Sequence, residues 1–291
     1  MPIRIISILF PVFAITAIGY FVARKRRPDM LDANRLTMEV FAPALIFGAL
    51  ASREFDLAQY RWLALAMLIV VALSGVAGWV LARMLAVEVK TFVPPMMYGN
   101  SGNLGLPVAV LAFGQQGLPA ALILFMTSTL VHFTYGVHML SPRVNIWNVW
   151  RVPSVLASIA GLLVSLLHVE LWAPLVISIR MLGEICIPLM LFALGVRMCD
   201  IDFSTWRLGV AGGIARPVIG MGLSWLVGTL LGLQGQEMAA LLLFGALPPA
   251  LLNYIFAERY GQEPEQVASI VLIGNLFALL TLPIALALTL R

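Results

Sequence analysis

Ten long apolar segments follow one another along this 291-residue chain, with only short polar loops between them. A helix needs about 20 apolar residues to cross the hydrocarbon core of a bilayer, and each segment approaches or exceeds that length. The chain is 61% hydrophobic and 11% charged, whereas a soluble domain carries roughly 25% charged residues. We therefore expect an all-α polytopic membrane protein with ten transmembrane helices. The segments are residues 3–23, 31–50, 61–87, 91–113, 117–140, 153–170, 172–198, 205–232, 237–260 and 264–290.

The lysines and arginines are distributed unevenly between the two sides that ten spans would define. Twelve of the 18 lie in or beside the odd-numbered loops, and four lie at the termini or in the even-numbered loops. Short loops rich in Lys and Arg stay in the cytoplasm. The pattern therefore predicts that both termini lie on the outer side of the membrane. It also explains the basic composition without any nucleic-acid partner.

The fourth apolar segment is interrupted at Pro94–Pro107, which is rich in glycine, proline and polar residues. Glycine and proline weaken the helical hydrogen-bond ladder. Broken backbone at membrane depth persists only where protein or a water-filled cavity satisfies its N–H and C=O groups. Transporters build their substrate sites at such breaks, although polar residues there can also serve only to satisfy the backbone. The candidate substrate-binding residues are Asn100, Ser101, Gly102 and Asn103.

The ninth segment repeats the features of the fourth. Phe113-Gly114-Gln115 and Tyr260-Gly261-Gln262 lie 147 residues apart, and the same offset carries residues 99–107 onto 246–254. That second window again contains prolines and an asparagine inside an apolar segment. An odd number of spans in each half makes the halves insert in opposite directions, as in inverted-repeat transporters. The further candidate site residues are Pro248, Pro249, Asn253 and Tyr254; a packed proline kink is the alternative.

The chain therefore divides by sequence into two inverted five-helix repeats. We place the first at residues 1–140, a cytoplasmic linker at 141–152, and the second at 153–291.

Four charged residues fall within or near the apolar segments, where charge is costly and commonly functional. Arg180 and Glu184 are one helical turn apart and form either an anion-attracting and proton-carrying pair or a structural ion pair. Arg216 supplies positive potential for an anion or pairs with Glu184. Glu39 couples protons or extends to the cytoplasmic interface. All four are candidates for charge or proton coupling.

Three stretches of the chain resemble the auxin efflux carrier family, which includes the plant PIN transporters and bacterial relatives. They are Asn100–Pro107, Ala246-Leu-Pro248 with Phe256–Tyr260 after it, and Thr281-Leu-Pro283. The resemblance implies that broken helices four and nine cross each other. It also implies a transport domain of spans 3–5 and 8–10 that slides, like an elevator, against a scaffold of spans 1, 2, 6 and 7.

The same resemblance carries individual roles onto this chain. Asn100 falls on the family's substrate-contacting asparagine and Pro107 on the proline of the crossing; near Asn253 the plant relatives have a proline. The expected substrates are small organic anions, either auxin-like or mono- and dicarboxylates. The resemblance further implies a homodimer through the scaffold helices. We expect the protein in a bacterial inner membrane, where the lysine and arginine pattern makes both termini periplasmic.

The leading interpretation is a secondary transporter of a small organic anion. The alternatives are a crossed-helix cation/proton antiporter, or a sodium-coupled organic anion symporter. An antiporter site needs carboxylates to hold a hard cation, and neither broken window contains Asp or Glu. An enzyme is not expected, because the membrane segments contain no metalloprotease His-Glu motif and no paired aspartates. We expect no cofactor and no metal.

Overall fold

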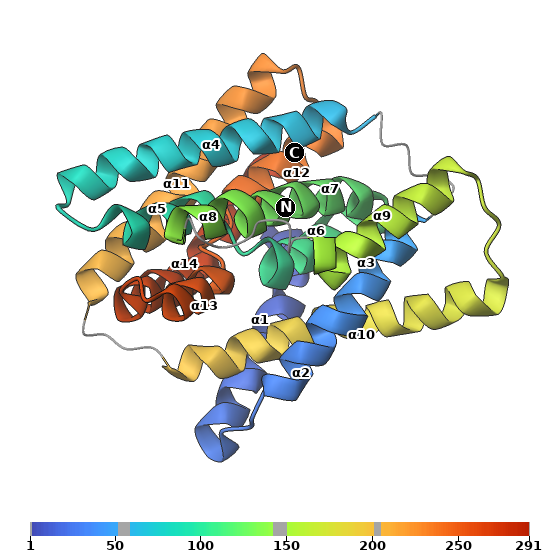
Figure 1. Ribbon diagram of the computed structural model, residues 1–291, viewed down its shortest axis with the longest axis horizontal. Helices are drawn as coiled ribbons and strands as arrows, with labels where there is room; N and C mark the ends of the chain where they lie inside the picture. Colours follow the sequence, from blue (N-terminus) through green and yellow to red (C-terminus); the bar gives the residue numbers. More distant parts are fainter. Residues whose placement is uncertain (1, 52–58, 142–149, 201–204, 291) are drawn as a thin grey trace. The chain divides into compact units, whose positions relative to one another are not determined.

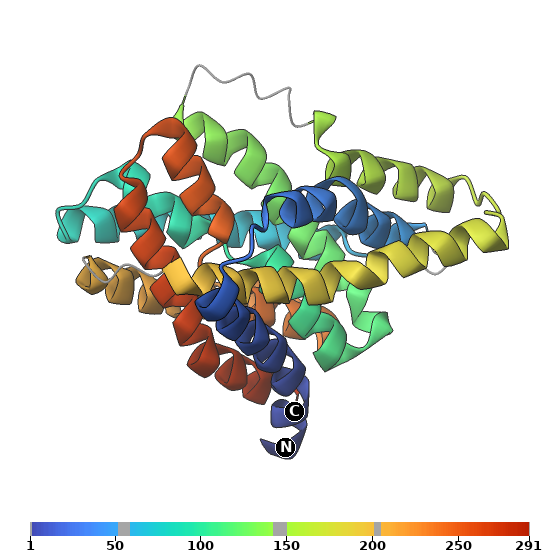
Figure 2. The ribbon, with the colours of Figure 1, turned by 90° about the horizontal axis from the view of Figure 1, so that it is seen from below.

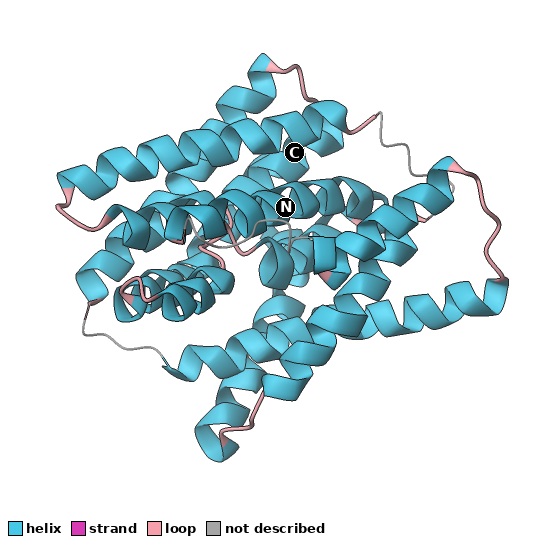
Figure 3. Cartoon of the chain, viewed as in Figure 1, coloured by secondary structure: helices cyan, strands magenta, loops and turns pink. Residues whose placement is uncertain are grey.

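The computed structural model describes residues 2–51, 59–141, 150–200 and 205–290. Within those ranges the regular structure is helical, apart from a single antiparallel bridge between Gly99 and Pro249 (Figures 1 and 3). The helical content agrees with the predicted all-α class.

The chain forms two compact units. Unit 1 comprises Met1–Leu9, Trp62–Ile146 and Asp200–Arg291, and unit 2 comprises Phe10–Arg61 and Trp147–Cys199. Each unit therefore combines segments from both sequence halves. Most of the predicted linker lies outside the described residues, because 142–149 are not among them.

Unit 2 contains most of one long helix, whose residues up to Leu9 belong to unit 1. An interrupted helix and two further helices complete it. Glycines allow close contacts between them: a Cβ on Gly183 would lie 2.9 Å from Leu45 Cα, and one on Gly161 would lie 3.0 Å from Leu50 Cβ. The helices are α1 (Pro2–Arg26), α2 (Leu31–Leu36), the wide turn η1 (Thr37–Phe41), α3 (Ala42–Leu50), α9 (Pro153–Leu166), α10 (Ala173–Arg197) and the short turn η6 (Met198–Asp200).

Unit 1 contains two helices that are interrupted in mid-course. Helices α4, α7, α11 and α14 pack against them, and Figure 2 shows the α13–α14 hairpin in red. The elements are α4 (Arg61–Met84), α5 (Val89–Met97), η2 (Ser101–Gly105), α6 (Leu106–Phe113), η3 (Gln115–Gly117), α7 (Leu118–Val131), η4 (His132–Gly136), α8 (Val137–Leu140), α11 (Trp206–Leu230), α12 (Gly235–Gly245), α13 (Leu251–Tyr260) and α14 (Pro264–Thr289).

Two of the wide π-type turns end two residues before a proline. The turn η1 ends at Phe41, ahead of Pro43, and η2 ends at Gly105, ahead of Pro107. Proline lacks an N–H and its ring crowds the preceding turn, so a helix accommodates it by widening that turn or by starting there. The prolines thus explain why predicted spans two and four are not regular α-helices.

Six of the described helices are long and apolar enough to cross a membrane: Pro2–Arg26, Arg61–Met84, Gln115–Leu140, Ala173–Arg197, Trp206–Leu230 and Pro264–Thr289. Shorter apolar helices, Ser101–Phe113 and Pro153–Leu166, lie in other predicted segments. Many large apolar side chains are exposed, as expected for a surface that contacts lipid. The protein is therefore an integral membrane protein with several spans, and the count of ten stays a prediction.

Small residues bring α11 and α14 together. Gly209 and Gly213 form a Gly-x-x-x-Gly pair on α11, and a Cβ on Gly213 would lie only 2.9 Å from the Cα of Gly274 on α14. In lipid, helices associate chiefly by such close backbone packing. Gly274 also lets α14 approach the second interrupted helix closely, because a Cβ on it would lie 2.7 Å from Pro249 Cδ.

Candidate functional site

The first interruption lies inside the predicted Pro94–Pro107 stretch but is shorter than it. Helix α5 continues through Pro94 and Pro95 to Met97, and the Tyr98 N–H closes its last turn on the Pro94 carbonyl at 3.0 Å. Tyr98 is extended, and helical structure resumes at Ser101. The break therefore occupies Tyr98–Asn100.

The second interruption separates α12 from α13. Helix α12 ends at Gly245, and the chain then runs through Pro248 and Pro249 to Ala250, the residue before α13. Two consecutive prolines cannot donate to a helical ladder. The break occupies Ala246–Ala250, which lies inside the predicted window.

The two breaks meet each other, and we call Tyr98–Asn100 together with Ala246–Ala250 the crossing. The Asn100 N–H donates to the Pro248 carbonyl at 2.7 Å, and the Ala250 N–H donates to the Tyr98 carbonyl at 2.9 Å. These bonds flank the Gly99–Pro249 bridge. Each break thus satisfies backbone groups that the other has released, which is the condition for broken helices at membrane depth. All residues of the crossing are buried.

Three asparagine amides complete the hydrogen bonding of the crossing. Asn253 Nδ2 donates to the carbonyls of Tyr98 (3.1 Å) and Ala250 (3.0 Å). Asn100 Nδ2 donates to Asn275 Oδ1 at 2.9 Å, and Asn275 Nδ2 donates to the Pro249 carbonyl at 3.1 Å. In this state the amides of Asn253 and Asn275 stabilise freed carbonyls. Sequence reasoning missed Asn275, although a single asparagine in the middle of an apolar helix was an available signal.

Four half-helix ends converge at the crossing: the carboxyl ends of α5 and α12, and the amino ends of Ser101–Phe113 and α13. The first N–H groups of a helix have no partner within it. Among the described residues, no side chain caps either amino end. Gly102 and Asn103 in the first of these ends, and Leu251 in the second, are partly exposed. Uncapped amino ends attract anions.

The remaining predicted residues of unit 1 lie around these ends. Ser101 is buried in the first turn, and Pro107 occupies the first turn of α6, where a missing N–H costs little. Tyr254 lies in the first turn of α13, and its hydroxyl donates to the Glu258 carboxylate at 3.3 Å.

A buried arginine from α11 also reaches the crossing. Arg216 is 2% exposed, and its Nη1 donates to the carbonyl of Gly245, the last residue of α12, at 3.0 Å. Within the described residues it has no carboxylate partner, and its Nε has no hydrogen bond. A cation that stands against a helix carboxyl end is favourably placed.

The other three charged candidates belong to unit 2, and both of their ion pairs are exposed. Arg35 and Glu39 are 3.0 Å apart. Arg180 and Glu184 are 3.7 Å apart, with side chains 71% and 69% exposed. Exposed pairs of this kind contribute little to stability.

One aromatic stack adjoins the crossing and was not foreseen. The rings of Tyr98 and His132 lie 3.9 Å apart and nearly parallel, at 8°. Both residues are buried, and His132 Nε2 and Asn253 Oδ1 have no partner within the described part of the chain. A histidine in mid-helix was the only sequence signal for this feature.

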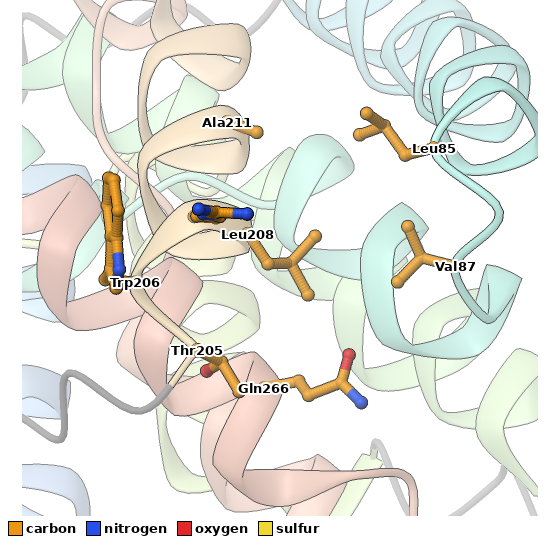
Figure 4. A pocket seen from close by; sticks show the side chains of 8 residues that line it. Leu85, Val87, Thr205, Trp206, Leu208, Ala211 and Gln266 are labelled. Atoms are coloured by element: carbon orange, nitrogen blue, oxygen red, sulfur yellow. The ribbon is translucent and has the colours of Figure 1, made fainter.

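A separate open cavity of about 630 Å³ lies elsewhere in unit 1 (Figure 4). Its lining comes mainly from the α4–α5 loop and the start of α11, and it includes none of the predicted site residues. The lining residues are Leu85, Val87, Thr205, Trp206, Arg207, Leu208, Ala211 and Gln266. We therefore place the candidate site at the crossing, where two uncapped helix amino ends and the buried Arg216 could attract an anion. In the described ranges, no group of three or more His, Cys, Asp or Glu residues could hold a metal ion.

Comparisons with known proteins agree on one family. Residues 4–146 and 143–286 match the family described as "Membrane transport protein". The chain is 20% identical to an uncharacterized transporter of Methanocaldococcus jannaschii, over 95% of this chain and 96% of that protein. It is 26% identical to a Rhizobium meliloti protein named "Putative malonate transporter", over 96% of this chain and 93% of that protein.

Plant carriers are similar over a shorter stretch. Auxin efflux carrier component 6 of Arabidopsis thaliana is 26% identical over 63% of this chain, which corresponds to 31% of that longer protein. The chain therefore belongs to the membrane transport protein family, the family of the auxin efflux carriers.

Proposed function

We propose that this protein is a secondary transporter that moves a small organic anion across the membrane by alternating access. The observation that carries the proposal is the crossing itself, where two interrupted helices meet and leave two amino ends uncapped. Amino ends of half-helices are a recurrent way to hold an anionic group at mid-membrane. The proposed substrate-binding residues are Asn100, Ser101, Gly102, Asn103, Pro107, Pro248, Pro249, Asn253 and Tyr254.

The absence of carboxylates favours an anion over a cation as cargo. None of the residues of the crossing carries a carboxylate, and the buried charge beside it, on Arg216, is positive. A cation/proton antiporter would need carboxylate oxygens there. Names of relatives point in the same direction, since one is named "Putative malonate transporter" and others auxin efflux carrier components.

We further propose an elevator mechanism with unit 1 as the transport domain and unit 2 as the scaffold. The separation of the chain into two compact units supports this division, because both breaks and their neighbours belong to unit 1. A scaffold homodimer in a bacterial inner membrane, with periplasmic termini, completes the proposal. Glu39, Arg180 and Glu184 are the candidates for coupling within unit 2.

The test introduces a negative charge at a helix amino end, where it should stabilise the helix but repel an anionic substrate. Asn103→Asp places a carboxylate in the first turn after Ser101, where it stabilises a helix start by about 0.3–1 kcal/mol. The same charge repels an anionic substrate, so uptake in reconstituted vesicles should fall by about tenfold or more. Asn34→Asp, in α2 of unit 2, is the matched control and should leave uptake unchanged.

The assay uses labelled malonate, lactate and indole-3-acetate, each with and without proton and sodium gradients. Asn100→Ala should also abolish uptake, but that variant loses the Asn275 contact as well, so its melting temperature must be measured beside it. Full uptake by a folded Asn103→Asp protein would refute an anion site at the crossing. A requirement for sodium would instead favour the symporter alternative.

A further inference from the structure

Arg216 is the one side chain of fixed charge that is fully buried in the described part of the chain. It lies in the middle of α11, directly before Pro217. A buried guanidinium without a carboxylate partner is costly, because the charge has left water and has gained only the partial negative charge of a helix carboxyl end in return. Its position therefore needs a reason.

Glycines from three segments make room for this guanidinium. A Cβ on Gly99, in the first break, would lie 2.7 Å from Arg216 Nη2, and a Cβ on Gly220 would overlap Arg216 Nη1. Gly245 presents its carbonyl to the same Nη1 and packs against the Gly220 backbone. The slot is shaped for this side chain, which holds it against both interrupted helices.

The charge at the crossing can be summed from its parts. Each half-helix end carries about half an elementary charge, positive at the amino end and negative at the carboxyl end. The two ends of each sign cancel, and Arg216 leaves a net charge of about +1. His132, which stacks on Tyr98, is counted as neutral at the pH of about 8 used in the experiment below, above the ordinary histidine pKa of about 6.5.

We propose that Arg216 is the internal counter-charge of the crossing and restricts its cargo to one negative charge. The inference rests on the proposed function and makes it narrower. A monocarboxylate brings the site to neutrality, whereas a dicarboxylate leaves it with a buried excess of one negative charge. Arg216 keeps its charge at any physiological pH, so the selection acts on the charge of the cargo.

The first experiment needs no variant. Wild-type protein in vesicles is given malonate or monomethyl malonate, and separately succinate or monomethyl succinate, at about pH 8, above the ordinary histidine pKa of about 6.5. Each pair shares a carbon skeleton and differs by one charge. Uptake of each ester should exceed that of its diacid by about tenfold or more, since an uncompensated buried charge costs several kcal/mol.

The second experiment assigns the preference to Arg216. In Arg216→Gln, affinity for the monoester should fall by about 30-fold or more, as when one partner of a buried charge pair is removed. Arg216→Lys should retain the ester preference because it retains the charge. Arg207→Gln removes an exposed cation from the same helix and should change neither the affinity for the monoester nor the preference for ester over diacid. Melting temperatures show which variants are folded.

The outcomes separate this inference from the function on which it rests. If the diacids move as well as the esters, or if folded Arg216→Gln keeps its ester affinity, the counter-charge role is wrong and the anion transporter stands. If no anion of either kind moves in the wild-type protein, the proposed function fails and the inference fails with it.

Discussion

The hydrogen bond between Asn100 and Asn275 joins the first break to α14, and it supports a quantitative prediction. Asn275 accepts from Asn100 Nδ2 at 2.9 Å and donates to the Pro249 carbonyl at 3.1 Å. Both asparagines are buried. Asn275→Ala therefore leaves two polar groups without partners, the Asn100 amide and the Pro249 carbonyl.

The cost can be bounded from these two orphaned groups. Leaving a buried polar group unpaired costs about 1–3 kcal/mol in soluble proteins. Couplings measured in membrane proteins are smaller, about 0.6 kcal/mol on average and about 1.7 at most. The crossing is buried in protein, so we expect a coupling between Asn100 and Asn275 of about 1–2 kcal/mol.

A double-mutant cycle measures this coupling. The variant with both Asn100→Ala and Asn275→Ala leaves only the Pro249 carbonyl unpaired, so it should be no less stable than Asn275→Ala alone. At roughly 2–4 °C per kcal/mol, the double variant should melt about 2–8 °C above the value that additivity gives. Thermal unfolding in detergent micelles reports the difference.

Leu280→Ala is the control, because Leu280 is exposed on the same helix and should have little effect. Strict additivity of the two asparagine substitutions, within about 0.5 kcal/mol, would show that the two side chains do not interact. In that case the bond between Asn100 and Asn275 would contribute nothing to holding the first break against α14.

Two further predictions concern glycines at close contacts. Gly213→Ala drives a Cβ to 2.9 Å from Gly274 Cα, so it should lower stability by about 1–3 kcal/mol, whereas Gly222→Ala on the same helix meets nothing within 4 Å and should raise stability by about 0.5–1 kcal/mol. Equal melting shifts for this pair would contradict the close packing of α11 on α14. Gly136→Ala places a Cβ 2.9 Å from the buried Tyr98 ring and should lower both the melting temperature and transport, because Tyr98 belongs to the crossing. Unchanged values in both assays would mean that the ring can move freely.

Local signals in the sequence were sufficient for the helices and for the position of the breaks. Apolar segments predicted helix ends to within a few residues: segment 205–232 corresponds to Trp206–Leu230, and segment 264–290 to Pro264–Thr289. The first break was predicted too broadly, since α5 absorbs Pro94 and Pro95 and opens only at Tyr98. The presence of prolines alone does not determine at which turn a helix is interrupted.

The relation between distant residues was harder to predict. An offset of 147 residues aligned the two helix-breaking windows by sequence. It could not show that Gly99 would pair with Pro249 in an antiparallel bridge. The role of Asn275 could not be predicted from sequence either, because it depends on the Pro249 carbonyl that the side chain contacts in the folded protein.

The sequence by itself determined a helical membrane protein with two interrupted helices, because apolar length and helix-breaking residues act over a few turns of chain. Tertiary structure alone decided that the two interruptions complete each other's hydrogen bonds and that Arg216 stands against them. The bonds between the interruptions join groups more than 100 residues apart in the chain, such as Asn100 and Pro248, and Arg216 reaches a carbonyl 29 residues away. Burial makes each of these contacts necessary, since a polar group inside the protein must find its partner there rather than in water.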